Sequence, residues 1–182
     1  MNKNMKETAS IYIFDTNIFL TGIDFNLIEG YIYTTPSIIE ELNDNRYKEK
    51  NRNILSKINA AIETRKLKIK VPQVKYVTKI NEISKITGDF NALSDADKGL
   101  LAISLELIEA HGKALRIYSN DYSIENVCSE LNIPFSSLYK DGIESKIIWE
   151  IYCPHCKRIY KAEDLDKICT ICGLKLKRRS KK

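Results

Sequence analysis

Short apolar runs alternate with amphipathic stretches along the first 140 residues of the chain. Four runs rich in β-branched and aromatic residues predict strands, at Ile11–Phe14, Tyr31–Tyr33, Leu67–Val71 and Leu115–Tyr118. The stretches between them carry apolar residues at helical spacing. Strands that alternate with helices predict an α/β fold with a parallel sheet.

Polar residues and prolines mark where the helices begin. Thr35-Pro36 precedes one helical pattern, Ser94 precedes a long one that we expect to end at Gly112, and Ser123 precedes a third. Cys128 shares the apolar face of the third helix, so we interpret it as a small core residue without chemistry of its own.

Of four candidate acidic residues, three lie at or near the carboxyl ends of the predicted strands, where open parallel sheets place their functional crevice. Asp15 directly follows the first strand, and Asp121 follows the fourth after two intervening residues. Glu41 lies in the helix after the second strand, and Asp97 lies at the start of the long helix. Acids in these places are candidates for chemistry.

Helical geometry distinguishes two of these acids from their neighbours. Asp97 precedes apolar or small residues three, four and seven positions later, so it lies on the buried stripe, whereas Asp95 lies about 200° away and points to solvent. Glu41 borders the apolar face of its helix, and Glu40 points away. A carboxylate beside an apolar face is costly unless cations or hydrogen bonds satisfy it.

Taken singly, each acid has an ordinary alternative role as a turn residue, a helix cap or a flanking charge. Asp97, for example, completes a capping box with Ser94. Taken together, converging carboxylates raise one another's pKa unless a divalent cation lies among them. Ligands that are all oxygen suit Mg²⁺ or Mn²⁺.

Two Cys-x-x-Cys pairs near the C-terminus have the spacing of a metal site. Cys153 and Cys156 are separated by twelve residues from Cys169 and Cys172. Four thiolates bind a tetrahedral Zn²⁺, and about 30 residues bury too little apolar surface to fold without it. Two disulfides are disfavoured because the N-terminus has no signal-peptide pattern. Iron bound as in rubredoxin remains an alternative.

Positive charge is concentrated in the same C-terminal segment. The chain carries +5 overall, with ten Lys and Arg against three acids in residues 151–182, which leaves 19 against 21, or −2, for residues 1–150. Residues 175–182 hold six cations and no acid. Such a run either stays solvated or neutralises phosphates, and its position beside a zinc module favours nucleic acid.

Four segments carry a family resemblance, namely Phe14-Asp15-Thr16-Asn17, Thr35 to Leu42, Leu93-Ser94-Asp95-Ala96-Asp97 and Ser119-Asn120-Asp121-Tyr122. They resemble, in order, the four acidic motifs of PIN-domain ribonucleases. Thr87-Gly88-Asp89, Ile124 to Val127 and the four-cysteine ribbon extend the resemblance to the Nob family, endonucleases that mature the 3′ end of small-subunit ribosomal RNA. Asn120 departs from relatives that have a further aspartate there.

The resemblance implies a PIN domain over residues 10–140 with a five-stranded parallel sheet, a linker over 141–150, a zinc ribbon over 151–175 and a basic tail over 176–182. It implies that Asp15, Glu41, Asp97 and Asp121 hold one or two Mg²⁺ or Mn²⁺ ions, and that cleavage leaves a 5′-phosphate and a 3′-hydroxyl. Thr16 and Asn17 are candidates for orienting Asp15 or a water.

The expected partners are precursor ribosomal RNA and the pre-small ribosomal subunit, in the cytoplasm, with no membrane and no nucleotide cofactor. For RNA we expect two groups of cations to act: Arg46, Lys48, Lys50 and Arg52 in a solvated loop after the Glu41 helix, and Lys175, Lys177, Arg178 and Arg179 in the tail. Tyr152 and Tyr160 either stack on bases or pack against the metal core. A non-catalytic assembly factor and a PIN ribonuclease with a different RNA substrate, such as a toxin-type nuclease, remain alternatives. A nucleotide-binding Rossmann enzyme is disfavoured because the glycines form no GxGxxG.

Overall fold

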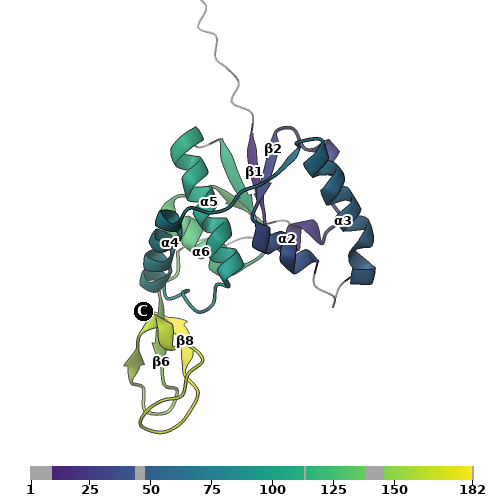
Figure 1. The fold of residues 1–182 in the computed structure, drawn as a ribbon. Helices are drawn as coiled ribbons and strands as arrows, with labels where there is room; N and C mark the ends of the chain where they lie inside the picture. The colour runs from purple at the N-terminus through teal and green to yellow at the C-terminus, as the bar shows by residue number, and fades with distance from the viewer. Residues whose placement is uncertain (1–9, 44–47, 113, 138–145, 182) are drawn as a thin grey trace, which may run out of the picture.

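A computed structural model describes residues 10–43, 48–112, 114–137 and 146–181, without the side chains of residues 26 and 48–52. Its larger unit is built on a parallel sheet (Figure 1). The strands are β1 (Ile11–Phe14), β2 (Tyr31–Thr34), β3 (Leu67–Ile69), β4 (Leu115–Tyr118) and β5 (Phe135–Ser136), in the order β3-β2-β1-β4-β5. All four strand pairs are parallel, which confirms the predicted fold class.

Helices connect these strands, as the alternating pattern predicts. They are α1 (Thr16–Phe19), α2 (Pro36–Leu42), α3 (Lys48–Glu63), α4 (Val74–Thr87), α5 (Asp95–His111) and α6 (Tyr122–Leu131), with a short 3₁₀ turn η1 (Phe25–Leu27). Thr35 and Ser94 are the N-caps of α2 and α5, and Gly112 ends α5. The start of α6 differs from the prediction, because Asp121 is its N-cap and Ser123 lies inside the helix.

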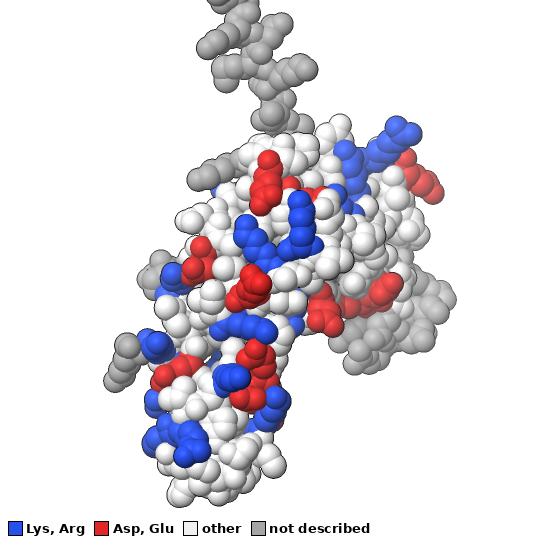
Figure 2. All heavy atoms as spheres, turned by 60° about the vertical axis from the view of Figure 1, so that its left-hand side comes forward, with Lys and Arg blue, Asp and Glu red and all other residues white. Residues whose placement is uncertain are grey.

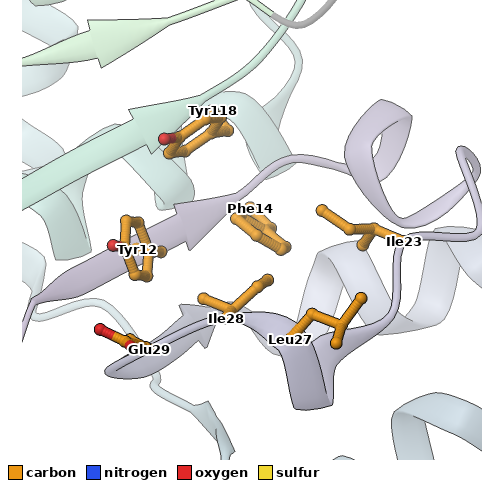
Figure 3. A pocket seen from close by; sticks show the side chains of 7 residues that line it. All are labelled: Tyr12, Phe14, Ile23, Leu27, Ile28, Glu29 and Tyr118. Carbon is orange, nitrogen blue, oxygen red and sulfur yellow. The ribbon is translucent and has the colours of Figure 1, made fainter.

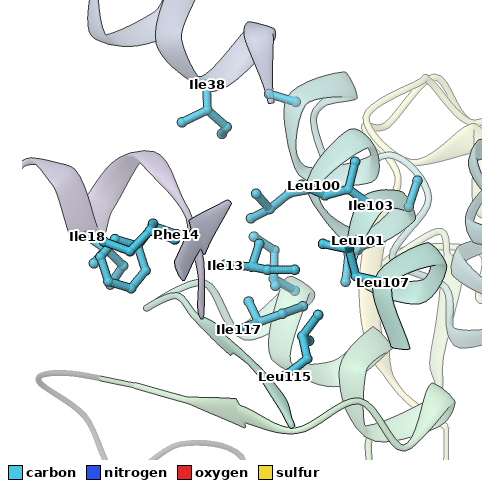
Figure 4. Packing of buried hydrophobic residues seen from close by; sticks show 14 of the residues in the cluster. Ile13, Phe14, Ile18, Ile38, Leu100, Leu101, Ile103, Leu107, Leu115 and Ile117 are labelled. Atoms are coloured by element: carbon cyan, nitrogen blue, oxygen red, sulfur yellow. The ribbon is translucent and has the colours of Figure 1, made fainter. Parts of the chain in front are cut away.

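The core lies between the sheet and the long helix α5. Ile13 and Ile117 project from β1 and β4 towards Leu101 and Leu107 of α5 (Figure 4). Fully burying one such side chain contributes about 1.5–3 kcal/mol relative to its exposed state. Cys128 is fully buried within the same core, which confirms its interpretation as a packing residue. Because α5 is held along its buried face, the acid at its first turn has a fixed position.

The basic stretch after α2 is not the loop that the sequence suggested. Lys48, Lys50 and Arg52 lie in the first turns of α3, and Arg46 lies outside the described residues. The helical spacing of Ile54, Ile58 and Ala61, of which the last two are buried, explains why the segment is helical rather than extended.

The C-terminal unit is a small antiparallel sheet of β6 (Trp149–Tyr152), β7 (Ile159–Tyr160) and β8 (Lys177–Ser180), in the order β7-β6-β8. It has its own small core around Ile151 and Leu176, with the buried Cys153 and Cys169. The ribbon therefore begins within the expected linker and includes the segment expected to be a free tail. The sequence did not predict β8 because this strand lacks alternating apolar residues: it consists of Lys, Arg, Arg and Ser. It forms a strand by backbone pairing with β6.

The ribbon lies at one end of the larger unit, below α4 and α6 in Figure 1. No helix in the described part of the chain is both long and apolar enough to cross a membrane.

Candidate functional site

Asp15 lies at the carboxyl end of β1, where its backbone and side chain form the N-cap of α1. The residue is 3% exposed. Its Oδ1 accepts a hydrogen bond of 2.6 Å from the Thr16 amide, and its Oδ2 accepts bonds from the Asn17 side chain at 3.3 Å and from the Ser119 hydroxyl at 2.8 Å. The carboxylate is therefore fixed from three directions.

Ser119 is a site residue that the sequence reasoning missed. Besides donating to Asp15, its hydroxyl oxygen accepts a bond of 3.0 Å from the Asp121 amide, so one hydroxyl joins two of the acids. The register of the sheet would have identified Ser119. Phe14 is paired with Tyr118, so the residues that follow the two strands, Asp15 and Ser119, lie side by side.

Asp97 and Asp121 are each held by a backbone amide at a helix start. The Ser94 amide donates to Asp97 Oδ2 at 2.7 Å, and the Ser123 amide donates to Asp121 Oδ1 at 2.7 Å. Asp97 is half-buried, whereas Asp95 is fully exposed, as the helical geometry predicts. Asp97 and Asp121 therefore both act as ordinary caps at helix starts, and the charges of both act on Asp15.

Glu41 joins the group through α1. The Thr16 hydroxyl donates to Glu41 Oε2 at 2.6 Å, so Thr16 orients Glu41 by its side chain and Asp15 by its amide. Glu40 and Glu41 are both exposed, so burial does not separate them. The contact with α1 distinguishes Glu41.

Charge interactions link the four acids. Burial raises the pKa of Asp15 from 3.8 to about 6; the hydrogen bonds of Ser119 and Thr16 oppose this shift, while the charges of Asp97 and Asp121 reinforce it. Burial also raises the pKa of Asp97, whose carboxyl is stabilised as an anion by Ser94 and destabilised by the charges of Asp121 and Glu41. Asp15 therefore lies within the field of Asp97 and Asp121, and Asp97 lies within the field of Asp121 and Glu41.

Oxygen donors of this kind fit a hard divalent cation, which would relieve the mutual repulsion. In the described part of the chain, no three carboxylates have ligand oxygens within 4.8 Å of one another. Mg²⁺ does not require such a cage, because it keeps several waters and is usually bound through one or two carboxylates.

The four ribbon cysteines, Cys153, Cys156, Cys169 and Cys172, do meet that spacing, since their sulfurs all lie within 4.8 Å of one another. The Cys153–Cys172 and Cys156–Cys169 Sγ distances are 3.3 and 3.6 Å. Disulfides need about 2.05 Å, and all four thiols are free. Zn–S bonds of about 2.3 Å in a tetrahedron place the sulfurs about 3.8 Å apart. The cluster therefore has the geometry of a four-thiolate metal site.

Tyr160 belongs to this metal centre. Its hydroxyl lies 3.0 Å from Cys169 Sγ, and this hydrogen bond is the main cause that lowers the pKa of Cys169 to about 5. Thiolates are the form that binds metal. Of the two roles considered for this tyrosine, packing against the metal core is the one that the structure shows.

The cations expected to bind RNA are distributed among acidic partners. Arg178 pairs with Asp89 at 3.1 Å, Arg179 pairs with Glu150 at 2.6 Å, and Lys175 pairs with Asp166 at 2.8 Å. On the face shown in Figure 2, blue and red atoms are interspersed where the ribbon meets the larger unit. Their role in RNA binding stays a prediction.

A polar groove of about 620 Å³ runs between the ribbon and the loop before α5. It is lined by Asn91 and Ala92 on one side and by Leu165, Asp166 and residues 175–178 on the other. Lys175 and Lys177 are both exposed here. The groove offers positive charge on the ribbon side of the loop that leads to Asp97.

A second hollow, of about 230 Å³, is apolar and lies apart from this groove (Figure 3). The rings of Tyr12, Phe14 and Tyr118 face Ile23, Leu27 and Ile28 across it, with Glu29 at one side. None of the four acids lines it. Its volume is below the roughly 300–1,000 Å³ of pockets for small ligands.

Comparison with known proteins gives the class first. Residues 12–107 match the PIN domain of ribonucleases, a stretch that contains Asp15, Glu41 and Asp97.

Three curated relatives extend the likeness beyond that domain. An endoribonuclease Nob1 of Methanocaldococcus jannaschii is 32% identical over 98% of this chain and 86% of its own length. An endoribonuclease Nob1 of Pyrococcus abyssi is 32% identical over 91% of both chains. A ribonuclease VapC1 of Thermoplasma acidophilum is 30% identical over 92% of this chain and 77% of its own length. The chain belongs to the PIN-domain endoribonucleases of the Nob1 family.

Proposed function

We propose that this endoribonuclease cleaves precursor small-subunit ribosomal RNA at its 3′ end during ribosome maturation, with Mg²⁺ or Mn²⁺ held by Asp15, Glu41, Asp97 and Asp121. One observation supports the proposal most strongly: the charges of Asp97 and Asp121 act on Asp15, and those of Asp121 and Glu41 act on Asp97, so charge interactions link four acids from separate segments. The Nob1 relatives support the choice of ribosomal RNA.

In this proposal the four acids hold the cation, and Thr16 and Ser119 orient the acids. When bound, the cation activates a water and neutralises charge on the scissile phosphate. Asp15 is fixed by Ser119 and by the Thr16 amide, so it meets the cation in a set orientation. The Thr16 hydroxyl, which donates to Glu41, orients the Glu41 carboxylate.

Neither histidine supports a mechanism with a histidine base. His111 ends α5, and Asp97 lies in the first turn of the same helix. Fourteen residues at about 1.5 Å per residue place them about 21 Å apart. His155 lies between two of the ribbon cysteines.

The ribbon supports RNA binding in this proposal. Lys175 and Lys177 line the groove and are exposed. Lys177 is available to phosphates, and Lys175 would exchange its pairing with Asp166 for one with a phosphate. Arg46, Lys48, Lys50 and Arg52 remain proposed contacts at the start of α3 or just before it. Such contacts position an RNA backbone without reading its sequence.

A PIN ribonuclease with a different RNA substrate is the second candidate, and the VapC1 relative is the observation that favours it. A non-catalytic assembly factor is the weaker alternative, because the acids are held in place by specific hydrogen bonds.

The test uses an RNA that spans the 3′ end of the small-subunit sequence and its downstream precursor. We expect one main cut, dependent on added Mg²⁺ or Mn²⁺, that leaves a 3′-hydroxyl on the mature side. Asp97→Asn should abolish cleavage while RNA binding is kept, because the amide keeps the shape and loses the charge that holds a hard cation. Asp95→Asn is the matched control two residues away, on the exposed side of α5.

The outcomes separate the candidates. Equal loss of cleavage in both variants contradicts the assignment of Asp97 to the site. Metal-dependent cutting of unrelated RNAs at the same rate favours the second candidate. Binding without any cleavage by the wild-type protein favours the assembly factor.

A further inference from the structure

A buried polar joint connects the ribbon to the nuclease unit. Asp89, which is fully buried, follows the end of α4 and accepts hydrogen bonds from two directions. Its Oδ1 lies 3.1 Å from Nη1 of Arg178 on β8, and its Oδ2 accepts from Nδ2 of Asn126 on α6 at 2.6 Å. The same Arg178 nitrogen lies 3.4 Å from the Ser123 hydroxyl.

Further contacts hold the strand that enters the ribbon. The Asn126 amide both donates to the Ile147 carbonyl and accepts from the Ile147 amide, each at 2.7 Å. The guanidinium of Arg178 lies 4.7 Å from the ring centre of Trp149. Gly88, with φ of +81°, brings its backbone against Trp149 so closely that a Cβ would clash with the Trp149 carbonyl. The ribbon is therefore docked by shape as well as by charge.

The joint also continues into the acidic cluster on both of its branches. The carbonyl of Asp89 accepts bonds from the amides of Ala92 at 2.9 Å and Leu93 at 3.0 Å, and this turn leads directly to Ser94, whose amide holds Asp97. On the other branch, Ser123 contacts Arg178 by its hydroxyl and holds Asp121 by its amide. One arginine of the ribbon thus contacts the two segments that carry Asp97 and Asp121.

We propose that Arg178 is a positioning residue of the nuclease site: docked on Asp89 and Ser123, it sets the two turns that present Asp97 and Asp121 to the catalytic cation. Folding of the ribbon around its own metal then affects how well the nuclease site binds Mg²⁺ or Mn²⁺. The proposal rests on the proposed metal role of these acids. The expectation that Arg178 also binds RNA stays a separate prediction, because this residue lines the groove as well.

The alternative is a simple fastening that stabilises the ribbon without affecting the site. Removing the arginine leaves a buried carboxylate without its cation, which is destabilising in either case. Stability alone does not separate the two roles, so the test measures the affinity of the nuclease site for Mn²⁺.

The experiment titrates Mn²⁺ into zinc-loaded, full-length protein and follows free Mn²⁺ by electron paramagnetic resonance, at a temperature where circular dichroism shows every variant folded. Asp97→Asn defines the binding that belongs to the nuclease site. We expect Arg178→Gln to weaken that binding about tenfold, the scale seen when a residue that orients metal ligands is lost. Arg178→Lys, which keeps the charge with a different donor geometry, should lose less and also serves if the glutamine variant does not fold.

Arg179→Gln is the matched control, because Arg179 is the next residue of β8 and pairs with Glu150 inside the ribbon. It should leave Mn²⁺ affinity unchanged. Wild-type Mn²⁺ affinity in both Arg178 variants, or an equal loss in Arg179→Gln, overturns the proposal. If the wild-type protein and Asp97→Asn bind Mn²⁺ alike, the proposed metal site itself fails, and the role of Arg178 fails with it.

Discussion

Replacing Asp15 with asparagine should stabilise the metal-free protein increasingly as the pH rises. The folded protein holds the Asp15 proton with a pKa of about 6, against 3.8 for the ordinary side chain. The folded state thus binds this proton more tightly than the unfolded state, so ionisation of Asp15 destabilises the fold as pH rises through this window. The total cost is about 3 kcal/mol, because each pKa unit corresponds to about 1.36 kcal/mol.

The variant also loses hydrogen bonds, but that loss does not depend on pH. The Nδ2 group of an asparagine would face the Ser119 hydroxyl and the Asn17 amide, both of which now donate to Asp15. The pH dependence of the difference in unfolding free energy, variant minus wild type, isolates the charge. Between about pH 5 and about pH 7.5 we expect this difference to rise by about 1.4 kcal/mol, the part of the cost that accumulates in that interval.

Urea unfolding followed by far-ultraviolet circular dichroism measures this difference, since all described α-helices lie in the nuclease unit. The protein should be zinc-loaded, without added Mg²⁺ or Mn²⁺ and without chelator. Adding Mg²⁺ should then stabilise the wild type and not the variant. A difference that is constant or falls with pH would refute the argument that burial raises the pKa of this carboxyl.

Three further predictions concern the ribbon. Elemental analysis should find about one zinc per chain, and removal of zinc should unfold the ribbon while the helical signal remains, because the two apolar cores are separate; a folded ribbon without metal would contradict this. Lys175→Gln with Lys177→Gln should weaken RNA binding and lower the slope of log affinity against log salt by about 0.7 per lost phosphate contact; an unchanged slope would remove both lysines from the interface. Gly88→Ala should destabilise the joint by about 1–3 kcal/mol, because it strains the backbone and meets the Trp149 carbonyl; fluorescence of Trp149, the one tryptophan of the chain, should report the opening, and an unchanged spectrum would contradict it.

Local patterns predicted most of the nuclease fold. β1, β2 and β4 lie where apolar runs indicated strands, and the caps of α2 and α5 are the residues that capping chemistry favours. β5 has only two residues, too few for a periodic pattern, so it was expected only from the family resemblance. β8 was expected to be a tail because its pairing comes from a partner strand and not from its own side chains.

The candidate site could be predicted only in part, because sequence patterns report local structure and not long-range contacts. The four acids could be proposed because strand ends and helix faces are local properties, and their role as metal ligands stays a prediction. Ser119 was missed because its contact with Asp15 spans 104 residues and depends on sheet register. Arg178 was grouped with other cations of the tail because its partner Asp89 precedes it by 89 residues, which composition cannot reveal.

The capping of three acids by backbone amides has a consequence for how readily the site is loaded. Asp15, Asp97 and Asp121 each accept an amide hydrogen bond at a helix start, so their rotamers are selected when the chain folds. Side-chain freedom lost during folding is not lost again on binding, which lowers the entropic cost of capturing an ion. While no cation is present, the same amide dipoles stabilise the negative charges of the carboxylates and so offset part of the repulsion between them. If these acids hold the proposed cation, its binding and release require little movement of the three side chains and no rearrangement of the fold.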